Sequence, residues 1–534
     1  MDYRAMIEDL EIQISMLPIG YISKKNINGN VYYYQQWTEN GKVKSKYIKK
    51  SELEQFEGQI AKRKQLEKEL KDLKEKEKKH VEVISYVPHK ERYKTNVVFG
   101  TALQDMGEAV RGYEARPCFE ELTNYLDSPE VDKICILYGL KRTGKTTLIR
   151  QALFRMTKIQ LDRSAYIKII KSNTMAELAQ DLKDLYDKKV RYVFIEDVTN
   201  VSDFIESASV LSDVFAATGM KIVLSSQEPL SFWNVIHDEL YHKADMIHTT
   251  FISYGEYSVI MDNDSLDNYM EFGGVLGEEK PEFDEYIGKN GELTEDIQKG
   301  IEKICRRFLS KILTREYVEQ KLGLTSKVSI WERRKDKQPQ YVEVSEIYND
   351  TTINLLKDLD FVKECPAAGI NDTVEEVKEF LFLQPGRKYL KCRELIEPFL
   401  KELKFDNLSA SDKQIIVEGV LEEIRNNILK DIVLFETSRG VSERYRAFRL
   451  HLPKGSFDMV VYDKEQNQCT VFEIIDEKEV QQKNYKNLID EAKINELEKH
   501  YGKITTKYIL YRGEDYFEDD KIVYMNVENY LKSL

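Results

Sequence analysis

The chain has 534 residues, of which 42% are hydrophobic and 32% are charged, and its formal net charge is -13 at pH 7. This acidic balance excludes a surface that coats nucleic acid over its whole area, so any basic patch must be local. At roughly 150 residues per domain, we expect about three or four domains.

No apolar run reaches about 18 residues, which predicts that no segment spans a membrane. The opening text, MDYRAMIEDLEIQ, carries acids and lacks the apolar core of a signal peptide. The histidines show no metal-ligand spacing, and the cysteines are scattered without a CxxC pair. We therefore expect reduced thiols and a cytoplasmic location. The cysteines are Cys118, Cys135, Cys305, Cys365, Cys392 and Cys469.

Residues 1–80 are predicted to form a small three-stranded sheet with helices. Three strand-like runs are separated by Asn28-Gly29 and Asn40-Gly41, which are strong hairpin signals. A long charged helix is expected from Ser51 to about Lys79.

Lysines and aromatic residues are concentrated in these strands, which predicts contact with DNA or RNA. Lys42, Lys44 and Lys46 alternate and should line one face of the third strand. The alternative is a solvated face whose aromatic residues pack on the helices and whose lysines protect a sheet edge. The other members of the set are Lys24, Lys25, Lys49, Lys50, Tyr32, Tyr33, Tyr34, Trp37 and Tyr47.

A connector with few patterns precedes a predicted P-loop domain at residues 110–260. There, apolar strands alternate with helices, which is typical of a parallel sheet covered on both faces. The text GLKRTGKT, Gly139 to Thr146, matches the phosphate-binding loop pattern between a buried strand and a helix. Its glycines and amides predict an ATP site, in which Lys145 reaches the β- and γ-phosphates and Thr146 ligates Mg²⁺. The remaining residues of this predicted site are Lys141, Arg142, Thr143, Gly144 and Thr147.

A second buried strand, RYVFIED, ends in Glu196 and Asp197. Such strands end in an acid that holds Mg²⁺ through water, and a following acid polarises the attacking water. Here Glu196 is one methylene longer than the usual metal-side Asp, and Asp197 is one shorter than the usual base. A misplacement of about 1 Å can slow hydrolysis around a hundredfold, so we expect ATP binding with slow turnover.

Residues 261–300 are acidic and are expected to be an insertion or linker, and residues 301–405 are expected to be helical with a winged-helix-like element around FLQPGRKYLKCRELI. Residues 406–534 are predicted to form a small α/β domain. Its order is a long helix, antiparallel strands around FRLHL, FDMVVYD and CTVFEII, then a helix and a final strand, KYILYRG. The whole chain is thus expected to be a multidomain α/β protein.

Several stretches carry a resemblance: ICILYGLKRTGKTTLIRQAL, YVFIEDVTNVSDFIESASVLSDVFAATGMKIVLSS, DELYHKADMIHTTFISYGEY, GSFDMVVYD and ILYRGED. Over roughly residues 110–520 the chain resembles prokaryotic ATP-binding proteins that join an archaeal-type AAA-like P-loop ATPase domain to a C-terminal restriction-endonuclease-like domain. The chain departs from that family at the inverted Glu196-Asp197 pair. It also departs at Ser226-Gln227-Glu228-Pro229, which replaces a Gly-Thr-Asp-Ser-like run, and at Lys243, which replaces an Arg.

Nucleases of the PD-(D/E)xK type hold Mg²⁺ with acids on two strands and orient water with a Lys two residues after the second acid. Asp458 fits the first acid and Glu473 the second, but Ile475 stands at the Lys position. Lys478 lies too far along the strand to replace it. Where the family has a helical Glu, this chain has Lys430. These changes predict a silent domain. The alternatives are a rearranged site in which Lys430 supplies the missing charge, or a wrong domain assignment.

These motifs and the resemblance favour two functions. The first is an ATP-binding P-loop protein, AAA-like or of the STAND type, that acts as a nucleotide-dependent switch through DNA, RNA or a protein partner. The second is an ATP-regulated, Mg²⁺-dependent nuclease that uses Asp458, Glu473 and Lys430. An ordinary ATPase that remodels proteins is a third alternative. AAA-like domains often assemble in rings, so an oligomer is compatible with each.

Overall fold

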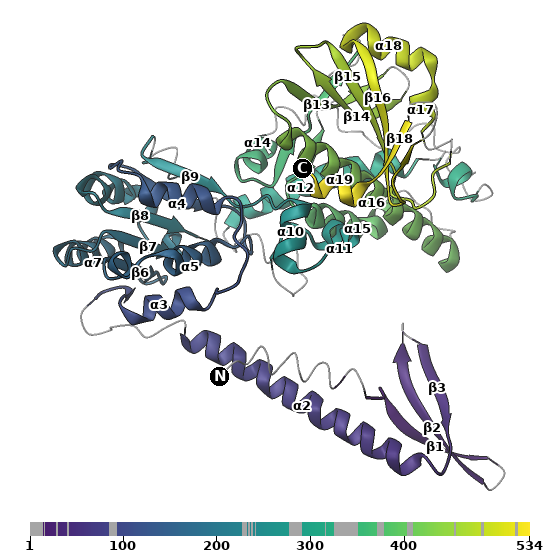
Figure 1. The fold of residues 1–534 in the computed structure, drawn as a ribbon, viewed down its shortest axis with the longest axis horizontal. Coiled ribbons are helices and arrows are strands. Elements are labelled where there is room, and N and C mark those ends of the chain that lie inside the picture. The colour runs from purple at the N-terminus through teal and green to yellow at the C-terminus, as the bar shows by residue number, and fades with distance from the viewer. Residues whose placement is uncertain are drawn as a thin grey trace.

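The structure is a computed structural model in which α-helices and several β-sheets form a multidomain α/β protein (Figure 1). It describes residues 14, 17–27, 30–39, 42–84, 93–226, 232, 235, 239–240, 242–276, 291–314, 317–324, 351–370, 379–402, 409–452, 455–481, 485–517 and 522–534. The α/β class and the multidomain organisation expected from the sequence are confirmed.

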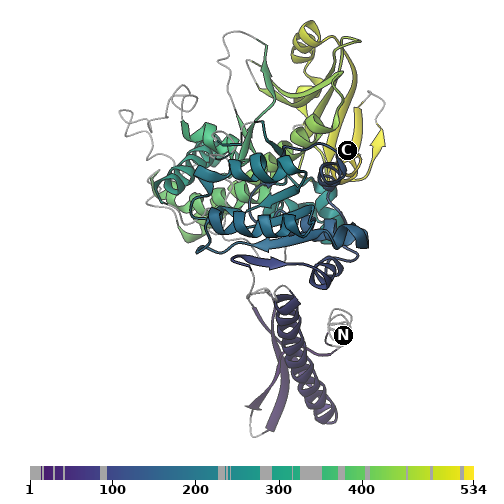
Figure 2. The ribbon, with the colours of Figure 1, turned by 90° about the vertical axis from the view of Figure 1, so that its left-hand side faces the viewer.

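The N-terminal region contains the expected three-stranded antiparallel sheet, in the order β1-β2-β3, followed by α2 (Leu53–Ile84). In two views at right angles, the three strands lie apart from the body formed by the later domains, and α2 extends from them to α3 (Thr101–Glu108) (Figure 1, Figure 2). The two predicted Asn-Gly turns lie outside the described residues. The strands are β1 (Tyr21–Ile27), β2 (Asn30–Glu39) and β3 (Lys42–Ile48).

The register of this sheet separates most of its lysines from its exposed tyrosines. Lys44 pairs with Trp37 and Lys46 pairs with Gln35, and directly paired residues share a face. Tyr34 pairs with Tyr47 and therefore lies on the opposite face from Lys44 and Lys46, because successive side chains alternate along a strand. The alternating lysines and the Tyr34–Tyr47 pair therefore form two different surfaces.

The second sheet has the strand order β4-β6-β7-β8-β5-β9, in which β4 is antiparallel to β6 and the other pairs are parallel. The buried parallel strands are the near-continuous apolar runs that the sequence predicts. The edge strand β4 and the helix α3 (Thr101–Glu108) lie in the segment that the sequence suggested was a connector. The strands are β4 (Asn96–Val98), β5 (Ile134–Tyr138), β6 (Ser164–Lys168), β7 (Tyr192–Glu196), β8 (Lys221–Ser225) and β9 (Ala244–His248).

Helices cover both faces of this sheet. On one face, α3, α4 (Phe119–Asp127) and α5 (Lys145–Arg155) bury apolar side chains against Cys135 and Leu137. On the other face, α7 (Met175–Asp187) contributes to an apolar cluster that also contains Ile134 and Ile136. This arrangement brings the end of β5 and the start of α5 together at one edge of the sheet, with β8 between β5 and β7.

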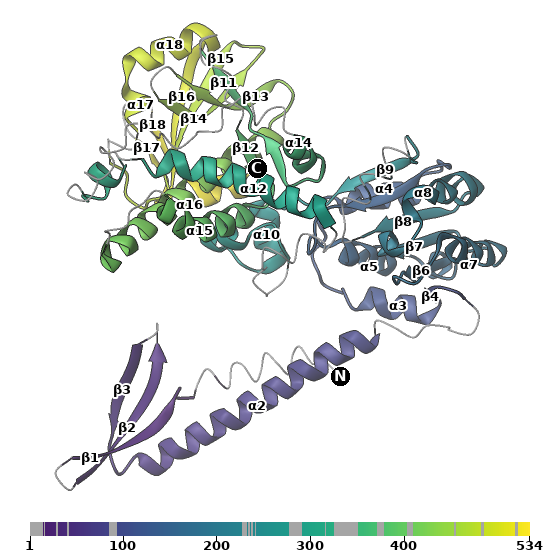
Figure 3. The same ribbon diagram turned by 180° about the vertical axis from the view of Figure 1, so that it is seen from behind.

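A helical segment follows and joins the two largest domains. Figure 3 shows α12 running from the P-loop sheet toward α16 (Ala410–Gly440). A short antiparallel pair, β10 with β12, accompanies the helices. The elements are α10 (Tyr254–Met261), α11 (Leu266–Phe272), α12 (Gly291–Ile312), η5 (Tyr317–Lys321), α14 (Thr351–Asp358), β10 (Val362–Glu364), β12 (Phe380–Phe382) and α15 (Pro385–Glu402).

The C-terminal sheet has the order β11-β13-β14-β15-β16-β18-β17. The antiparallel run β13-β14-β15 was expected. The predicted last strand is β16, however, and β17, β18 and α19 follow it. The strand β11 from the preceding segment also adds to the sheet, parallel to β13. The elements are β11 (Ala367–Gly369), β13 (Tyr445–His451), β14 (Ser456–Asp463), β15 (Gln468–Ile474), α17 (Lys486–Ile489), α18 (Glu491–Tyr501), β16 (Lys503–Tyr511), β17 (Tyr516–Phe517), β18 (Ile522–Asn526) and α19 (Val527–Lys532).

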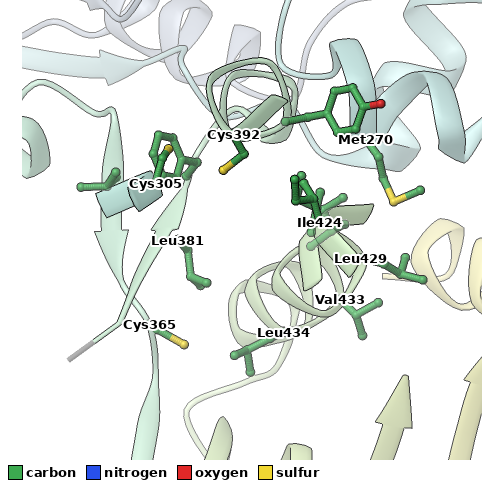
Figure 4. Packing of buried hydrophobic residues seen from close by; sticks show 14 of the residues in the cluster. Met270, Cys305, Cys365, Leu381, Cys392, Ile424, Leu429, Val433 and Leu434 are labelled. Atoms are coloured by element: carbon green, nitrogen blue, oxygen red, sulfur yellow. The ribbon is translucent and has the colours of Figure 1, made fainter. Parts of the chain in front are cut away.

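One apolar core runs from α10 and α11 through α12, α15 and α16 into the C-terminal sheet. Figure 4 shows Met270, Cys305, Cys392 and Ile424 converging within it. All six cysteines are buried and none forms a disulfide. Within the described residues, no helix is long and apolar enough to cross a membrane.

Candidate functional site

The phosphate-binding loop lies between β5 and α5. Gly139, Arg142 and Gly144 all have positive φ angles, of 149°, 60° and 84°. A Cβ atom at Gly139 would lie 2.4 Å from the Thr249 hydroxyl oxygen, so the close approach of the β9 end requires glycine there. The predicted residues Lys141 and Thr143 lie in this loop, and Lys145, Thr146 and Thr147 begin α5.

Lys145 is folded back over the loop. Its Nζ donates to the carbonyl oxygens of Gly139, at 2.7 Å, and Leu140, at 2.5 Å. Burial, assisted by the nearby charge of Arg116, lowers the pKa of Lys145 to about 7. A phosphate anion bound beside this amine would raise its pKa again and favour the charged ammonium form.

Glu196 ends β7 and has contacts to both carboxylate oxygens. The Thr146 hydroxyl donates to one oxygen, and the Tyr166 hydroxyl donates to the other. The Lys168 ammonium lies 3.2 Å from Glu196 Oε2 and 2.7 Å from Asp197 Oδ2. Burial opposes ionisation of Glu196, but Lys168 and the two hydroxyl donors hold its pKa below the usual value.

The predicted pair Glu196 and Asp197 therefore lies next to Thr146, as a magnesium-bound nucleotide site requires. Sequence reasoning missed Tyr166 and Lys168, which share one face of β6 because they are two residues apart. Lys168 pairs directly with Glu196 across the β6–β7 register. A lysine at the end of the strand beside RYVFIE was the only signal in the sequence.

β8 brings a serine into the same region. Ser225 is the register partner of Glu196 on one side and of Leu137 on the other. Its hydroxyl oxygen is buried and has no hydrogen-bond partner among the described residues. The Ser226 hydroxyl contacts the Thr199 hydroxyl, while the following residues 227–229 lie outside the described part.

Arg116 clamps the loop to the elements that follow β9. It is only 5% exposed, and its guanidinium donates to the carbonyl oxygens of Thr143, at 2.5 Å, and Thr249, at 2.7 Å. It also donates to the Phe251 carbonyl, at 2.7 Å, and pairs with Glu256 of α10, at 2.5 Å. No local pattern around Arg116 predicts this role, because these partners are 27 to 140 positions away.

Lys243, expected from the resemblance to replace an Arg, lies elsewhere. Its ammonium is 2.6 Å from Asp213 Oδ1, and both side chains are nearly half exposed. The structure therefore brings it into a surface ion pair rather than toward the loop.

The second candidate centre lies where α16 packs on two interior strands of the C-terminal sheet, β14 and β15. Lys430 Nζ on α16 is 2.9 Å from Asp458 Oδ1 on β14. Asp458 Oδ2 accepts from the Ile474 amide at 2.9 Å, and Asn487 donates to Glu473 Oε1 at 3.1 Å. The three predicted residues Lys430, Asp458 and Glu473 thus converge.

The charges of this centre are strongly coupled. Burial, followed by the charge of Asp458, raises the pKa of Glu473 well above its usual value. Burial opposes the charge of Asp458, but Lys430 holds its pKa low. These shifts favour the protonated form of Glu473 beside the ion pair of Asp458 and Lys430. Among the described residues, no group of three or more His, Cys, Asp or Glu side chains is placed to hold a metal.

The structure also places Ile475, which stands at the lysine position of the motif, and Lys478, which the sequence predicts to be too distant to replace it. Ile475 is buried in the apolar cluster that contains Val471 and Leu488. Lys478 is exposed beyond the end of β15. Neither residue supplies a cation to Asp458 or Glu473.

Helix α16 links the two centres. Six residues after Lys430, the Glu436 carboxylate accepts from the Tyr254 amide at 2.8 Å and from the Tyr269 hydroxyl at 3.3 Å. The Phe251 and Phe435 rings meet edge to face, 4.8 Å apart. The segment held by Arg116 beside the phosphate-binding loop therefore contacts the helix that carries Lys430.

The buried Glu436 carboxyl group is expected to make the stability of the folded protein depend on pH. Burial raises its pKa to about 8 from an unfolded value of 4.5, so the folded state binds the proton more tightly. This contribution is therefore favourable below about pH 4.5 and declines as pH rises toward about 8. We expect Glu436→Gln to stabilise the protein at pH 9 by on the order of a few kcal/mol and to flatten the decline. Urea unfolding at pH 6 and pH 9 measures this, and an equal pH response in both proteins would contradict it.

The sequence profile of a AAA domain matches residues 131–258, and the profile of a Domain of unknown function (DUF6788) matches residues 2–58. No curated protein matches the chain. The solved structure of C. elegans PCH-2 is 14% identical with a TM-score of 0.19, and the match covers 42% of this chain and 64% of that one.

A second solved structure is the Signal Transduction ATPase with Numerous Domains (STAND) protein with a tetratricopeptide repeat sensor, PH0952, from Pyrococcus horikoshii. It is 11% identical with a TM-score of 0.22, and the match covers 62% of this chain and 56% of that one. The chain thus spans less than two thirds of the length of either protein. The profile match, together with the strand–loop–helix geometry, identifies a P-loop ATPase domain of the AAA type within residues 131–258.

Proposed function

We propose that the protein is an ATP-binding switch in which the state of the phosphate-binding loop is transmitted to a C-terminal domain without nuclease activity. The observation that carries this proposal is the continuous set of contacts from Thr143 through Arg116 to Phe251, and from Tyr254 to Glu436 on α16. A switch needs an element that contacts both sites, and α16 has that position.

The nucleotide would bind over residues 139–147. The loop amides and the start of α5 would receive the phosphates, and Lys145 would leave the loop carbonyls to contact the β- and γ-phosphates. Thr146 would ligate Mg²⁺, and Glu196 would hold it through water. The contact between Thr146 and Glu196 supports this assignment, because the two metal-side groups already lie together.

Slow turnover is part of the proposal. Asp197 is the candidate base, but Lys168 binds its carboxylate at 2.7 Å and therefore restrains it. Glu196 has hydroxyl donors or a cation at both oxygens. The inverted order of Glu196 and Asp197 favours ATP binding over rapid hydrolysis. The Lys168 ammonium, which contacts both carboxylates, has the same effect.

Lys168 gives a direct prediction. We expect Lys168→Met to lower the Mg²⁺ concentration needed for half-maximal ATP binding by about fivefold, because it removes a cation beside the metal-side carboxylate. Turnover should rise as Asp197 is released. Lys171→Met, which removes an exposed lysine three residues later, is the matched control and should leave both values within twofold. Mg²⁺ titration of ATP binding makes the measurement, and slower turnover in Lys168→Met would contradict the restraint.

The C-terminal domain is proposed to have a restriction-endonuclease-like fold whose chemistry has been replaced by an ion pair. Lys430 supplies a fixed positive charge to Asp458, and this charge takes the place of the metal that a nuclease would bind. The buried apolar position of Ile475 removes the cation that would orient water. The domain would then perform no catalysis and would respond to nucleotide binding through its contacts with α16.

A cleavage assay separates this proposal from an active nuclease. The purified protein would be incubated with Mg²⁺ or Mn²⁺, ATP, and mixed DNA and RNA substrates. We expect no cleavage. Cleavage that Asp458→Ala abolishes would establish the rearranged nuclease instead and would overturn the silent-domain proposal.

A second candidate activity is single-strand nucleic-acid binding by the N-terminal sheet. The Tyr32 and Tyr34 rings lie 6.2 and 5.7 Å from that of Tyr47, and Lys25 lies over Tyr34 at 5.2 Å. Tyr47 is 51% exposed. Tyr32 and Tyr34 are half-buried beside it. A partly exposed tyrosine cluster with a lysine is a surface on which bases stack and phosphates are neutralised.

Fluorescence anisotropy with single-stranded DNA and RNA tests this activity. Tyr47→Ala should weaken binding by about tenfold, because stacking contributes about 1–3 kcal/mol per base. Lys44→Ala, on the opposite face, should have the smaller effect of one lost phosphate contact. The absence of binding by the unmodified protein would reject this second activity and leave the switch proposal unaffected.

A further inference from the structure

A cavity of about 540 Å³ lies between the helical segment and the C-terminal domain. Its walls come from α12, η5, β12, α15, α16 and β13, so it is separate from the phosphate-binding loop and from the Lys430 centre. This volume is in the range that holds a drug-sized or nucleotide-sized ligand. It lies against α16 directly beside Lys430, because Asp431 is one of its lining residues.

Buried and half-exposed ion pairs make part of its wall. Glu379 contacts Lys311 at 2.8 Å and Arg449 at 2.6 Å. Asp431 contacts Lys388 at 2.5 Å and Arg449 at 3.0 Å. Three cations thus meet two carboxylates. Burial opposes the charge of Arg449 and of Lys388, yet the neighbouring anions raise the pKa of both groups above their usual values, so both stay charged.

Arg307 adds to this excess of positive charge. It lines the cavity one helical turn before Lys311 on α12, and its guanidinium has no ion pair among the described residues. Lys321, on the facing element η5, is balanced by Glu423. In a chain with a net charge of -13, a concave surface with surplus cations focuses a local positive potential.

The cavity also has an apolar, ring-lined side. Phe308, Tyr317 and Phe380 belong to its wall. The Lys388 ammonium lies 4.2 Å from the centre of the Phe308 ring, so this side meets the cationic side directly. A ligand that fits both sides has a flat ring at one end and a multiply charged anion at the other.

We propose that this cavity is a second nucleotide site. The base lies against the aromatic side, and the phosphates contact Arg307 and Lys311 at the cationic side. Arginine and lysine bind phosphate through charge-assisted hydrogen bonds. A nucleotide here would bear on α16 from the side of Asp431, so it is placed to adjust the Lys430–Asp458 pair independently of the phosphate-binding loop.

Isothermal titration of ADP into the full-length Lys145→Ala protein tests the second site, because that variant removes the loop lysine. We expect ADP to bind. Arg307→Gln in the same background should weaken ADP binding by about 10- to 100-fold, the effect of losing one charge-assisted hydrogen bond. Arg306→Gln is the matched control, because Arg306 is the neighbouring residue and already pairs with Glu302 at 2.6 Å. It should leave ADP affinity within twofold.

Two further titrations separate the parts of the ligand. Adenosine and pyrophosphate should each bind at least tenfold more weakly than ADP, because each reaches only one side of the cavity. The proposal is overturned if the Lys145→Ala protein binds no ADP at millimolar concentration, if Arg307→Gln leaves ADP binding unchanged, or if pyrophosphate alone binds as tightly as ADP. Since every titration uses Lys145→Ala, failure here leaves ATP binding by the wild-type loop unaffected.

Discussion

Lys145→Ala is expected to lower the affinity for ATP by about a hundredfold, measured by isothermal titration in the presence of Mg²⁺. The lysine would contact two phosphate groups, and hydrogen bonds to charged groups contribute about 1.5–3 kcal/mol each. The fold should survive the change, because among the described residues the Lys145 ammonium otherwise contacts only the carbonyl oxygens of Gly139 and Leu140. Lys171→Ala, at an exposed position, is the control.

The titration of Lys145 adds a second readout to the same experiment. Its pKa is lowered to about 7 by burial, so much of the free protein carries the neutral amine above that pH. ATP binding should therefore take up a proton and should weaken as pH rises from 7 to 9. Heats measured in buffers of different ionisation enthalpy count that proton. Unchanged ATP affinity in Lys145→Ala would contradict the assignment of the site.

Lys430→Ala is expected to destabilise the C-terminal domain by about 3–5 kcal/mol, because it leaves the buried Asp458 carboxylate without its cation. The second variant, Lys430→Met with Asp458→Asn, removes both charges. It should recover most of that loss, because a neutral buried pair carries no uncompensated charge. Lys478→Ala, an exposed lysine near the same strand, should stay within about 0.5 kcal/mol of wild type.

Hydrogen exchange across β14 and β15 is the appropriate measurement, because the chain has several domains and need not unfold in one step. The single variant should accelerate exchange in both strands, and the double variant should restore protection. If Lys430→Ala left exchange unchanged, the ion pair would contribute nothing and the proposed replacement of the metal charge would be wrong.

The sequence alone was sufficient where the signal is local. GLKRTGKT is a contiguous pattern between a strand and a helix, so the loop residues and their order could be predicted from spacing. Asp458 and Glu473 could be predicted as neighbours, because they lie near facing ends of an antiparallel strand pair. Lys430 could be associated with them only through the resemblance, since it lies on a helix 28 positions before Asp458.

Contacts between distant elements could not be predicted. Arg116 binds carbonyl oxygens on two later segments, and nothing in the text around it specifies those partners. Tyr166 and Lys168 reach Glu196 because β6 lies beside β7 in the sheet, which is a property of strand order. The short strands β4 and β11 have three residues each, too few to show a period.

The N-terminal sheet illustrates the role of register. Alternation along β3 correctly places Lys44 and Lys46 on one face, but composition cannot tell which aromatic residues share it. The pairing of Tyr34 with Tyr47 decides that the cluster around the exposed Tyr47 ring lies on the other face. A one-residue change of register would reverse this arrangement.

The coupling of the two centres through α16 is the central claim, and hydrogen exchange of the full-length protein with and without Mg²⁺ and ATP tests it most directly. We expect nucleotide to change exchange in the loop, in α10 and along α16 from Glu436 to Lys430. In the Arg307→Gln background, which weakens the second nucleotide site, Lys145→Ala should abolish all of these changes together. A nucleotide effect confined to the loop, with α16 unchanged, would contradict the account.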